Sequence, residues 1–169
     1  DAAREQLEMW EEAGITDVFD MRGECDDTDF IHTHSYIRSH WFGVDDNGGK
    51  RSDDWFASLT EKCSEVLADP DCKILVHCHM GVNRGPSAMY AVMLTQGWGH
   101  LDALRAIRNA RPIAGIIYAP DAARWHASQA GKSQSEISAL GSEVEEWLER
   151  NYLDLAYVIR SIGNRIAQI

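Results

Sequence analysis

His77-Cys78-His79-Met80-Gly81-Val82-Asn83-Arg84-Gly85-Pro86-Ser87 is the most informative stretch of the chain, with five residues between its cysteine and its arginine. The apolar run 74–76 just before it is long enough for one buried strand, and Pro86 opens a helical pattern. A loop that joins a strand to a helix N-terminus presents free backbone N–H groups, which bind anions. We expect this loop to curl round one tetrahedral anion, with Cys78 at its floor and Arg84 at its rim.

This arrangement suits phosphoryl transfer. A helix N-terminus and inward-pointing amides stabilise a thiolate, which makes Cys78 a candidate nucleophile. The planar fork of Arg84 can hold two phosphoryl oxygens at once, and charge spreads over those oxygens in the transition state. The chemistry requires no metal, and we predict neither a metal nor another cofactor. The residues expected to contact the substrate are His79, Met80, Gly81, Val82, Asn83, Arg84 and Gly85.

The leaving oxygen needs a proton and the later water needs a base, and one carboxyl group can serve both in turn. Such a group should lie on a loop at the mouth of the pocket. Asp45 and Asp46 follow a strand candidate at 36–44 and precede a glycine-rich stretch. One of these two aspartates is therefore the candidate acid.

Composition indicates a globular chain with one main domain. The chain has 169 residues, of which 44% are hydrophobic and 25% charged. A net charge of −11 argues against a nucleic-acid or anionic-membrane surface, and no apolar run approaches a membrane span of about 20 residues. Four cysteines do not make a disulfide framework, and a nucleophilic thiol needs reducing surroundings, so we expect a cytoplasmic protein. The chain starts at Asp1 without a signal peptide pattern, and we expect that the true N-terminus was trimmed or is disordered.

The remaining sequence alternates between strand and helix patterns. The polar segment at 22–35 is predicted to be a loop. We predict strands over 15–21, 36–44 and 73–76, and helices over 2–13, 52–67, 86–96 and 101–109. This alternation predicts an α/β fold with a central, mostly parallel sheet flanked by helices. Active residues of such sheets lie at the carboxyl ends of strands, where Cys78 falls.

The C-terminal part predicts a linker over 128–141 and an extra amphipathic helix over 142–169. Ser142 and Glu145 fit a capping box at the start of that helix. The helix either packs on its own domain or mediates dimerisation or partner binding, and a homodimer is one expectation. Its apolar stripe comprises Val144, Leu148, Leu155, Ile159, Ile162, Ile166 and Ile169.

Taken together, these features resemble the cysteine-dependent dual-specificity phosphatases of the protein tyrosine phosphatase superfamily. The matching features are the His-Cys-x5-Arg loop at 77–84, an aspartate upstream of it, the Trp55-Phe56 pair, and the pattern at 106–112. The resemblance covers residues 2–127 and implies a phosphatase-like catalytic domain over 1–127.

The resemblance also implies a role for each matched residue. Cys78 would form a phosphocysteine intermediate, and Arg84 would bind the phosphoryl group. Alignment on the tryptophan–phenylalanine pair favours Asp46 over Asp45 as the acid. His77 would hydrogen-bond the loop and support the thiolate.

Two departures from the family pattern stand out. The family usually has Ser or Thr after the arginine, where the hydroxyl helps the thiolate leave, whereas this chain has Gly85. The phosphatases of regenerating liver have Ala there, so the hydroxyl is dispensable, and we expect phosphocysteine hydrolysis to limit turnover. The second departure is the pair His79 and Met80, which we expect to affect substrate choice.

The resemblance favours a dual-specificity protein phosphatase that acts on phosphotyrosine and on phosphoserine or phosphothreonine. Its partners would be phosphorylated proteins or small phosphomonoesters. One alternative is a pseudophosphatase-type module that binds phosphorylated partners without turnover. Another is a phosphatase for RNA 5′ ends, phosphoinositides or sugar phosphates, although few cations surround the loop.

Overall fold

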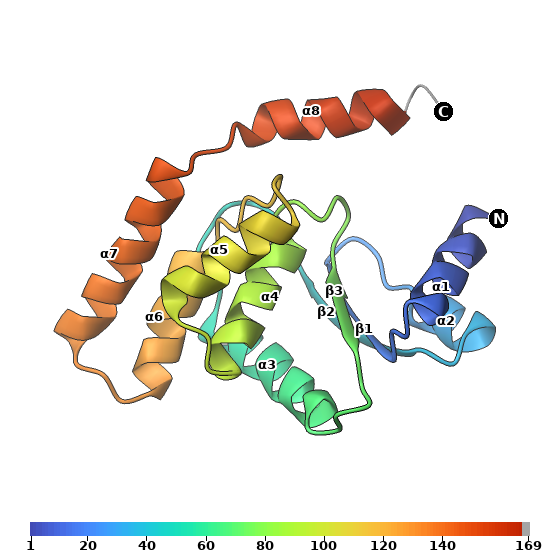
Figure 1. Ribbon diagram of the computed structural model, residues 1–169, viewed down its shortest axis with the longest axis horizontal. Coiled ribbons are helices and arrows are strands. Elements are labelled where there is room, and N and C mark those ends of the chain that lie inside the picture. The colour runs from blue at the N-terminus through green and yellow to red at the C-terminus, as the bar shows by residue number, and fades with distance from the viewer. Residues whose placement is uncertain (167–169) are drawn as a thin grey trace.

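A small parallel sheet lies between two sets of helices in the computed structural model, which describes residues 1–166 (Figure 1). Its strands are β1 (Asp17–Arg22), β2 (Arg38–Val44) and β3 (Ile74–His77), in the spatial order β2-β1-β3. Central β1 pairs in parallel with both neighbours. The predicted α/β class with a mostly parallel sheet is confirmed.

Helices α3 and α4 pack on one face of the sheet, whereas α1 and α2 cover the other; α5, α6 and α7 form an outer layer beyond α4 (Figure 1). Among the helices of residues 1–166, none is long and apolar enough to cross a bilayer. In chain order the helices are α1 (Ala2–Glu12), α2 (Thr28–His34), α3 (Asp53–Leu67), α4 (Arg84–Thr95), α5 (His100–Ala110), α6 (Ala119–Gln129), α7 (Gln134–Arg150) and α8 (Leu155–Ile166).

Strand β1 supplies both faces of the core. Val18 packs with Leu7 of α1 and Ile31 of α2. Phe19 and Met21 point the other way and pack against α3 and α4. Side chains alternate across a strand, so an apolar residue at successive positions buries both faces of the sheet. This burial fixes the carboxyl end of β1 beside the end of β3, where the cysteine loop begins.

Helix α2 lies within the segment 22–35 that sequence patterns predict as a loop, so that prediction is wrong for residues 28–34. The helix buries only Ile31. A single buried residue leaves no helical periodicity to detect, because one position cannot repeat.

Only residues 130–133 of the linker predicted over 128–141 lie outside a helix, because α6 continues to Gln129 and α7 begins at Gln134. The capping box that starts this helix is formed by Ser133 and Glu136. Glu136 N donates to Ser133 Oγ at 3.3 Å, and Ser133 N donates to Glu136 Oε2 at 2.8 Å. The similar pattern at Ser142 lies inside the helix, where its backbone groups already have helical partners.

The single helix predicted over 142–169 is two helices in the structure. Asn151 Nδ2 donates to Trp147 O at 2.8 Å where α7 ends. Asp154 Oδ1 then accepts a hydrogen bond of 2.9 Å from Tyr157 N, which begins α8. Asn and Asp side chains that bind nearby backbone groups favour helix ends over helix interiors, and this explains the break.

The apolar stripe of the C-terminal segment is therefore divided between two helices. Val144 and Leu148 of α7 pack into the core of their own domain. Leu155 and Ile159 of α8 instead face the cysteine loop. Ile169 lies outside the described residues, and dimerisation through this segment stays a prediction.

Candidate active site

The cysteine loop, residues 78–83, joins β3 to α4 at the carboxyl edge of the sheet. Gly81 has a φ of +63°, a left-handed conformation that glycine adopts without strain. Arg111 supports the loop from outside, because its Nη2 donates to Met80 O at 2.9 Å and its Nε donates to Gly81 O. The curled loop is therefore held by β3 and α4 at its two ends and by Arg111 along its carbonyl groups.

The backbone of the loop is free to bind an anion. Within the described chain, none of the N–H groups of residues 79–83 donates to a protein acceptor. Cys78 is only 8% exposed. A nearly buried nucleophile beside unpaired backbone amides has the geometry of a phosphate cradle.

Arg84 is held by two partners that leave one edge of its guanidinium group unused. Its Nη1 and Nη2 donate to the carboxylate of Glu24 at 2.5 and 2.8 Å, and Nη1 also donates to Val44 O at 3.1 Å. Its Nε is buried and has no hydrogen-bond partner among the described residues. Nε and the second hydrogen of Nη2 form an edge that can hold two phosphoryl oxygens side by side.

Glu24 is a site residue that sequence reasoning missed. It follows the carboxyl end of β1, the strand beside β3, and this position at the shared sheet edge is the signal that could have found it. The hydrogen bonds from Arg84 lower the pKa of Glu24 to about 2. In turn, the contact with Glu24 raises the pKa of Arg84. Both partners remain charged at neutral pH.

Asp46 lines the same cavity as the cysteine loop. Its Oδ1 accepts hydrogen bonds of 2.8 Å from Asn83 Nδ2 and from Tyr118 Oη, and its Oδ2 lies 3.7 Å from Arg84 Nε. Burial and the Asp46 carboxylate raise the pKa of Tyr118, so the hydroxyl stays a donor. Asp45 is exposed and is not among the described residues that line the cavity.

Tyr118 and Asn83 thus connect the candidate acid to the loop, and sequence reasoning gave Tyr118 no role. Asn83 Oδ1 accepts a hydrogen bond of 2.8 Å from Ile117 N, which orients its amide. The oriented amide then donates to Asp46. The acid and the cradle therefore belong to one hydrogen-bond network.

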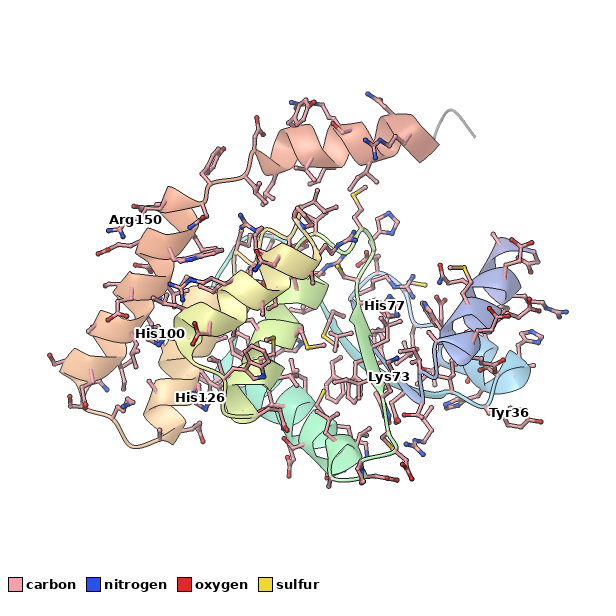
Figure 2. All side chains as sticks on the ribbon, viewed as in Figure 1. Tyr36, Lys73, His77, His100, His126 and Arg150 are labelled. Carbon is pink, nitrogen blue, oxygen red and sulfur yellow. The ribbon has the colours of Figure 1, made fainter. Side chains whose placement is uncertain are left out.

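His77 ends β3 and contacts the loop backbone, with its Nδ1 3.4 Å from Cys78 O (Figure 2). Its ring lies 5.5 Å from that of Trp10 on α1. Burial lowers the pKa of His77, which favours the neutral ring at neutral pH. A neutral ring in this place supports the backbone of the loop.

Gly85 packs tightly behind the cysteine. A Cβ at this position would lie 3.2 Å from the backbone carbon atoms of His77 and 3.3 Å from Cys78 N. A residue with a side chain therefore fits only if the backbone before it yields by a few tenths of an ångström. Of the predicted contact residues, Gly81 and Gly85 are outside the described lining of the cavity.

The cavity has a volume of about 260 Å³. It brings the predicted nucleophile, the arginine and Asp46 together, and two C-terminal residues that sequence reasoning did not place here complete it. Its lining consists of Asp46, Cys78, His79, Met80, Val82, Asn83, Arg84, Ile117, Leu155 and Ile159.

A cysteine under a nest of free amides, an arginine with an open edge and a facing carboxylate define the class of cysteine-dependent phosphatases. Residues 2–117 match the family model of the dual-specificity phosphatase catalytic domain, and the chain belongs to this family. The predicted family membership is confirmed. No curated protein sequence is significantly similar to the chain.

Solved structures share the fold at low sequence identity. Human DUSP28 is 17% identical, with a TM-score of 0.61 over 75% of this chain and 87% of that one. PTPMT1 in complex with PI(5)P is 15% identical, with a TM-score of 0.59 over 78% and 83% of the two chains. The human tyrosine phosphatase-like serine/threonine/tyrosine-interacting protein is 18% identical, with a TM-score of 0.59 over 75% and 85%.

Proposed function

We propose that this chain is a protein phosphatase that hydrolyses phosphotyrosine and phosphoserine or phosphothreonine through a phosphocysteine intermediate. The observation that supports it best is the free Nε–Nη2 edge of Arg84 in the same cavity as Cys78 and Asp46. A cytoplasmic location, where the thiol stays reduced, belongs to the same proposal.

In the first step the Cys78 thiolate attacks phosphorus, so that an S–P bond forms and the P–O bond to the substrate breaks. The loop amides and Arg84 hold the equatorial oxygens, on which negative charge is spread. Asp46, in its protonated form, gives its proton to the leaving oxygen.

In the second step the Asp46 carboxylate takes a proton from water as that water attacks phosphorus. The S–P bond breaks, inorganic phosphate leaves, and the Cys78 thiolate is restored. Gly85 offers no hydroxyl to this departing sulfur, and so the second step is expected to be the slower one.

Hydrolysis of 4-nitrophenyl phosphate in EDTA tests the mechanism, with Cys78→Ser as the comparison. We expect turnover that EDTA leaves intact and the serine variant abolishes. Acid quenching during turnover, followed by mass spectrometry, should trap a phosphate adduct on the peptide that contains Cys78. Activity that needs a metal, or that survives Cys78→Ser, would contradict the proposal.

A second candidate is a phosphoinositide phosphatase, which the likeness to PTPMT1 with bound PI(5)P favours. Phosphopeptides and phosphoinositides should be compared as substrates at equal concentration. The protein-phosphatase proposal expects the peptides to have the higher kcat/KM. The opposite order would favour the lipid activity.

A further inference from the structure

Helix α8 forms one wall of the catalytic cavity. Leu155 and Ile159, one turn apart on this helix, line the cavity together with Cys78 and Arg84. Figure 1 shows α8 passing over the loop that joins β3 to α4, apart from the layers that cover the sheet. The cavity therefore has a polar, phosphate-binding floor and an aliphatic wall.

The wall is attached to the phosphate loop by contacts at the start of α8. Gly115 leaves the space that Leu155 occupies, since a Cβ at position 115 would lie 2.9 Å from Leu155 Cδ2. Gly115 N also donates to Val82 O in the cysteine loop at 2.6 Å. Arg108 Nη1 donates to Asn151 O at 2.7 Å and holds the segment that precedes the helix.

Three further residues of the cavity lining are apolar, namely Met80, Val82 and Ile117. Ile117 and Ile159 remain 40% and 43% exposed, so their side chains are free to contact a substrate. Met80 and Val82 add apolar surface from the loop itself. Arg84 is the one arginine or lysine in the described lining of the cavity.

From this arrangement we infer that the α8 wall makes the enzyme selective for phosphate esters of an aromatic alcohol, phosphotyrosine above all. The inference rests on the proposed function. With the phosphoryl group on Arg84 and the loop amides, the ester group lies against the aliphatic wall. A phenyl ring buries far more apolar surface there than the single methylene of phosphoserine.

Phosphopeptide binding in the Cys78→Ser background tests this selectivity without requiring turnover. Two peptides of identical sequence, one with phosphotyrosine and one with phosphoserine, are titrated by calorimetry. Ile159→Ser should weaken phosphotyrosine binding about fivefold, and Leu155→Ser about tenfold, the range for apolar contacts in a pocket. Phosphoserine binding should change less than about twofold, because its methylene scarcely reaches the wall.

Tyr157→Ser is the matched control, since Tyr157 lies on the same helix, is 64% exposed and is outside the described lining of the cavity. It should bind both peptides as the parent does. Tighter binding of both peptides to Ile159→Ser would mean that α8 is an obstructing lid, and would overturn the inference. Equal weakening of both peptides, or no change in either, would overturn it as well.

Hydrolysis by the wild-type chain tests the proposed function separately from the peptide-binding measurements. If the wild-type chain shows no hydrolysis that depends on Cys78, the proposed function fails, whatever the peptides do. If hydrolysis is present but Ile159→Ser leaves the preference for phosphotyrosine unchanged, only the inference about α8 fails.

Discussion

Arg84 and Glu24 form a two-pronged ion pair, with Nη1 and Nη2 donating to the two carboxylate oxygens at 2.5 and 2.8 Å. The pair fixes the plane of the guanidinium group and leaves its buried Nε without a hydrogen-bond partner among the described residues. In the proposed mechanism Glu24 is a positioning residue, because it contacts Arg84, the proposed phosphate-binding arginine.

Replacing Glu24 should weaken substrate binding through Arg84. We expect Glu24→Gln to raise KM for 4-nitrophenyl phosphate about tenfold, since one charged partner of a buried guanidinium is lost. Steady-state kinetics measure this effect, and Asp29→Asn on α2 is a control carboxylate outside the site. An unchanged KM would show that Arg84 keeps its orientation without Glu24.

The two adjacent aspartates should differ sharply in their effect on turnover. Asp46→Asn removes the candidate acid and should lower kcat for a phosphotyrosine peptide about 100-fold. The loss should be smaller for 4-nitrophenyl phosphate, whose leaving group needs less protonation. Asp45→Asn should retain activity within about twofold, because Asp45 is exposed and outside the described lining. A crippled Asp45→Asn enzyme would reverse the assignment.

Gly85 should limit the second chemical step. Rapid mixing with 4-nitrophenyl phosphate should show a burst of nitrophenol followed by slower turnover, because the intermediate forms faster than it hydrolyses. Gly85→Ser supplies the hydroxyl and should raise kcat and reduce the burst.

Gly85→Ala is the matched control for that substitution. It introduces the same Cβ, 3.2 Å from the His77 backbone, without a hydroxyl group. The ratio of kcat between the serine and alanine variants therefore isolates the hydroxyl from the strain of the added carbon. A ratio of one or below, in variants that fold normally, would argue against a rate-limiting second step.

Asp17 should make the fold sensitive to strong acid. Its buried carboxylate accepts hydrogen bonds from Arg38, His40 and Thr16. Burial raises the pKa of Asp17, but these hydrogen bonds outweigh burial and lower it from 3.8 to about 2. The folded state therefore binds fewer protons than the unfolded state. The stabilisation, about 2 kcal/mol, is complete above the unfolded pKa and is lost as the pH falls through the folded one.

Urea unfolding at pH 5 and at pH 2.5 measures this dependence. The wild-type chain should lose more free energy of unfolding between these pH values than Asp17→Asn does, because the amide does not titrate. The exposed Asp29→Asn should lose as much as the wild type. Equal losses in Asp17→Asn and the wild type would contradict the assignment.

Local sequence determined the catalytic loop. A strand, a cysteine, five residues and an arginine at a helix start act through neighbouring backbone groups, so their spacing alone predicts the cradle around Cys78 and Arg84. The alternation of strand and helix patterns likewise predicted the parallel sheet. Consecutive apolar residues such as Val18 and Phe19 also predicted that β1 is buried on both faces.

The tertiary structure decided which distant groups complete the site. Glu24 lies 60 residues before Arg84, and only the strand order β2-β1-β3 brings their loops to one edge of the sheet. The neighbours Asp45 and Asp46 differ because Asn83 and Tyr118 hold only the second. The apolar stripe of the C-terminal segment showed that α8 must bury a face, but not against what. Leu155 at the start of α8 packs in the space left by the missing side chain of Gly115. No local sequence pattern predicts this contact, because the surface that buries a helix face belongs to another part of the chain.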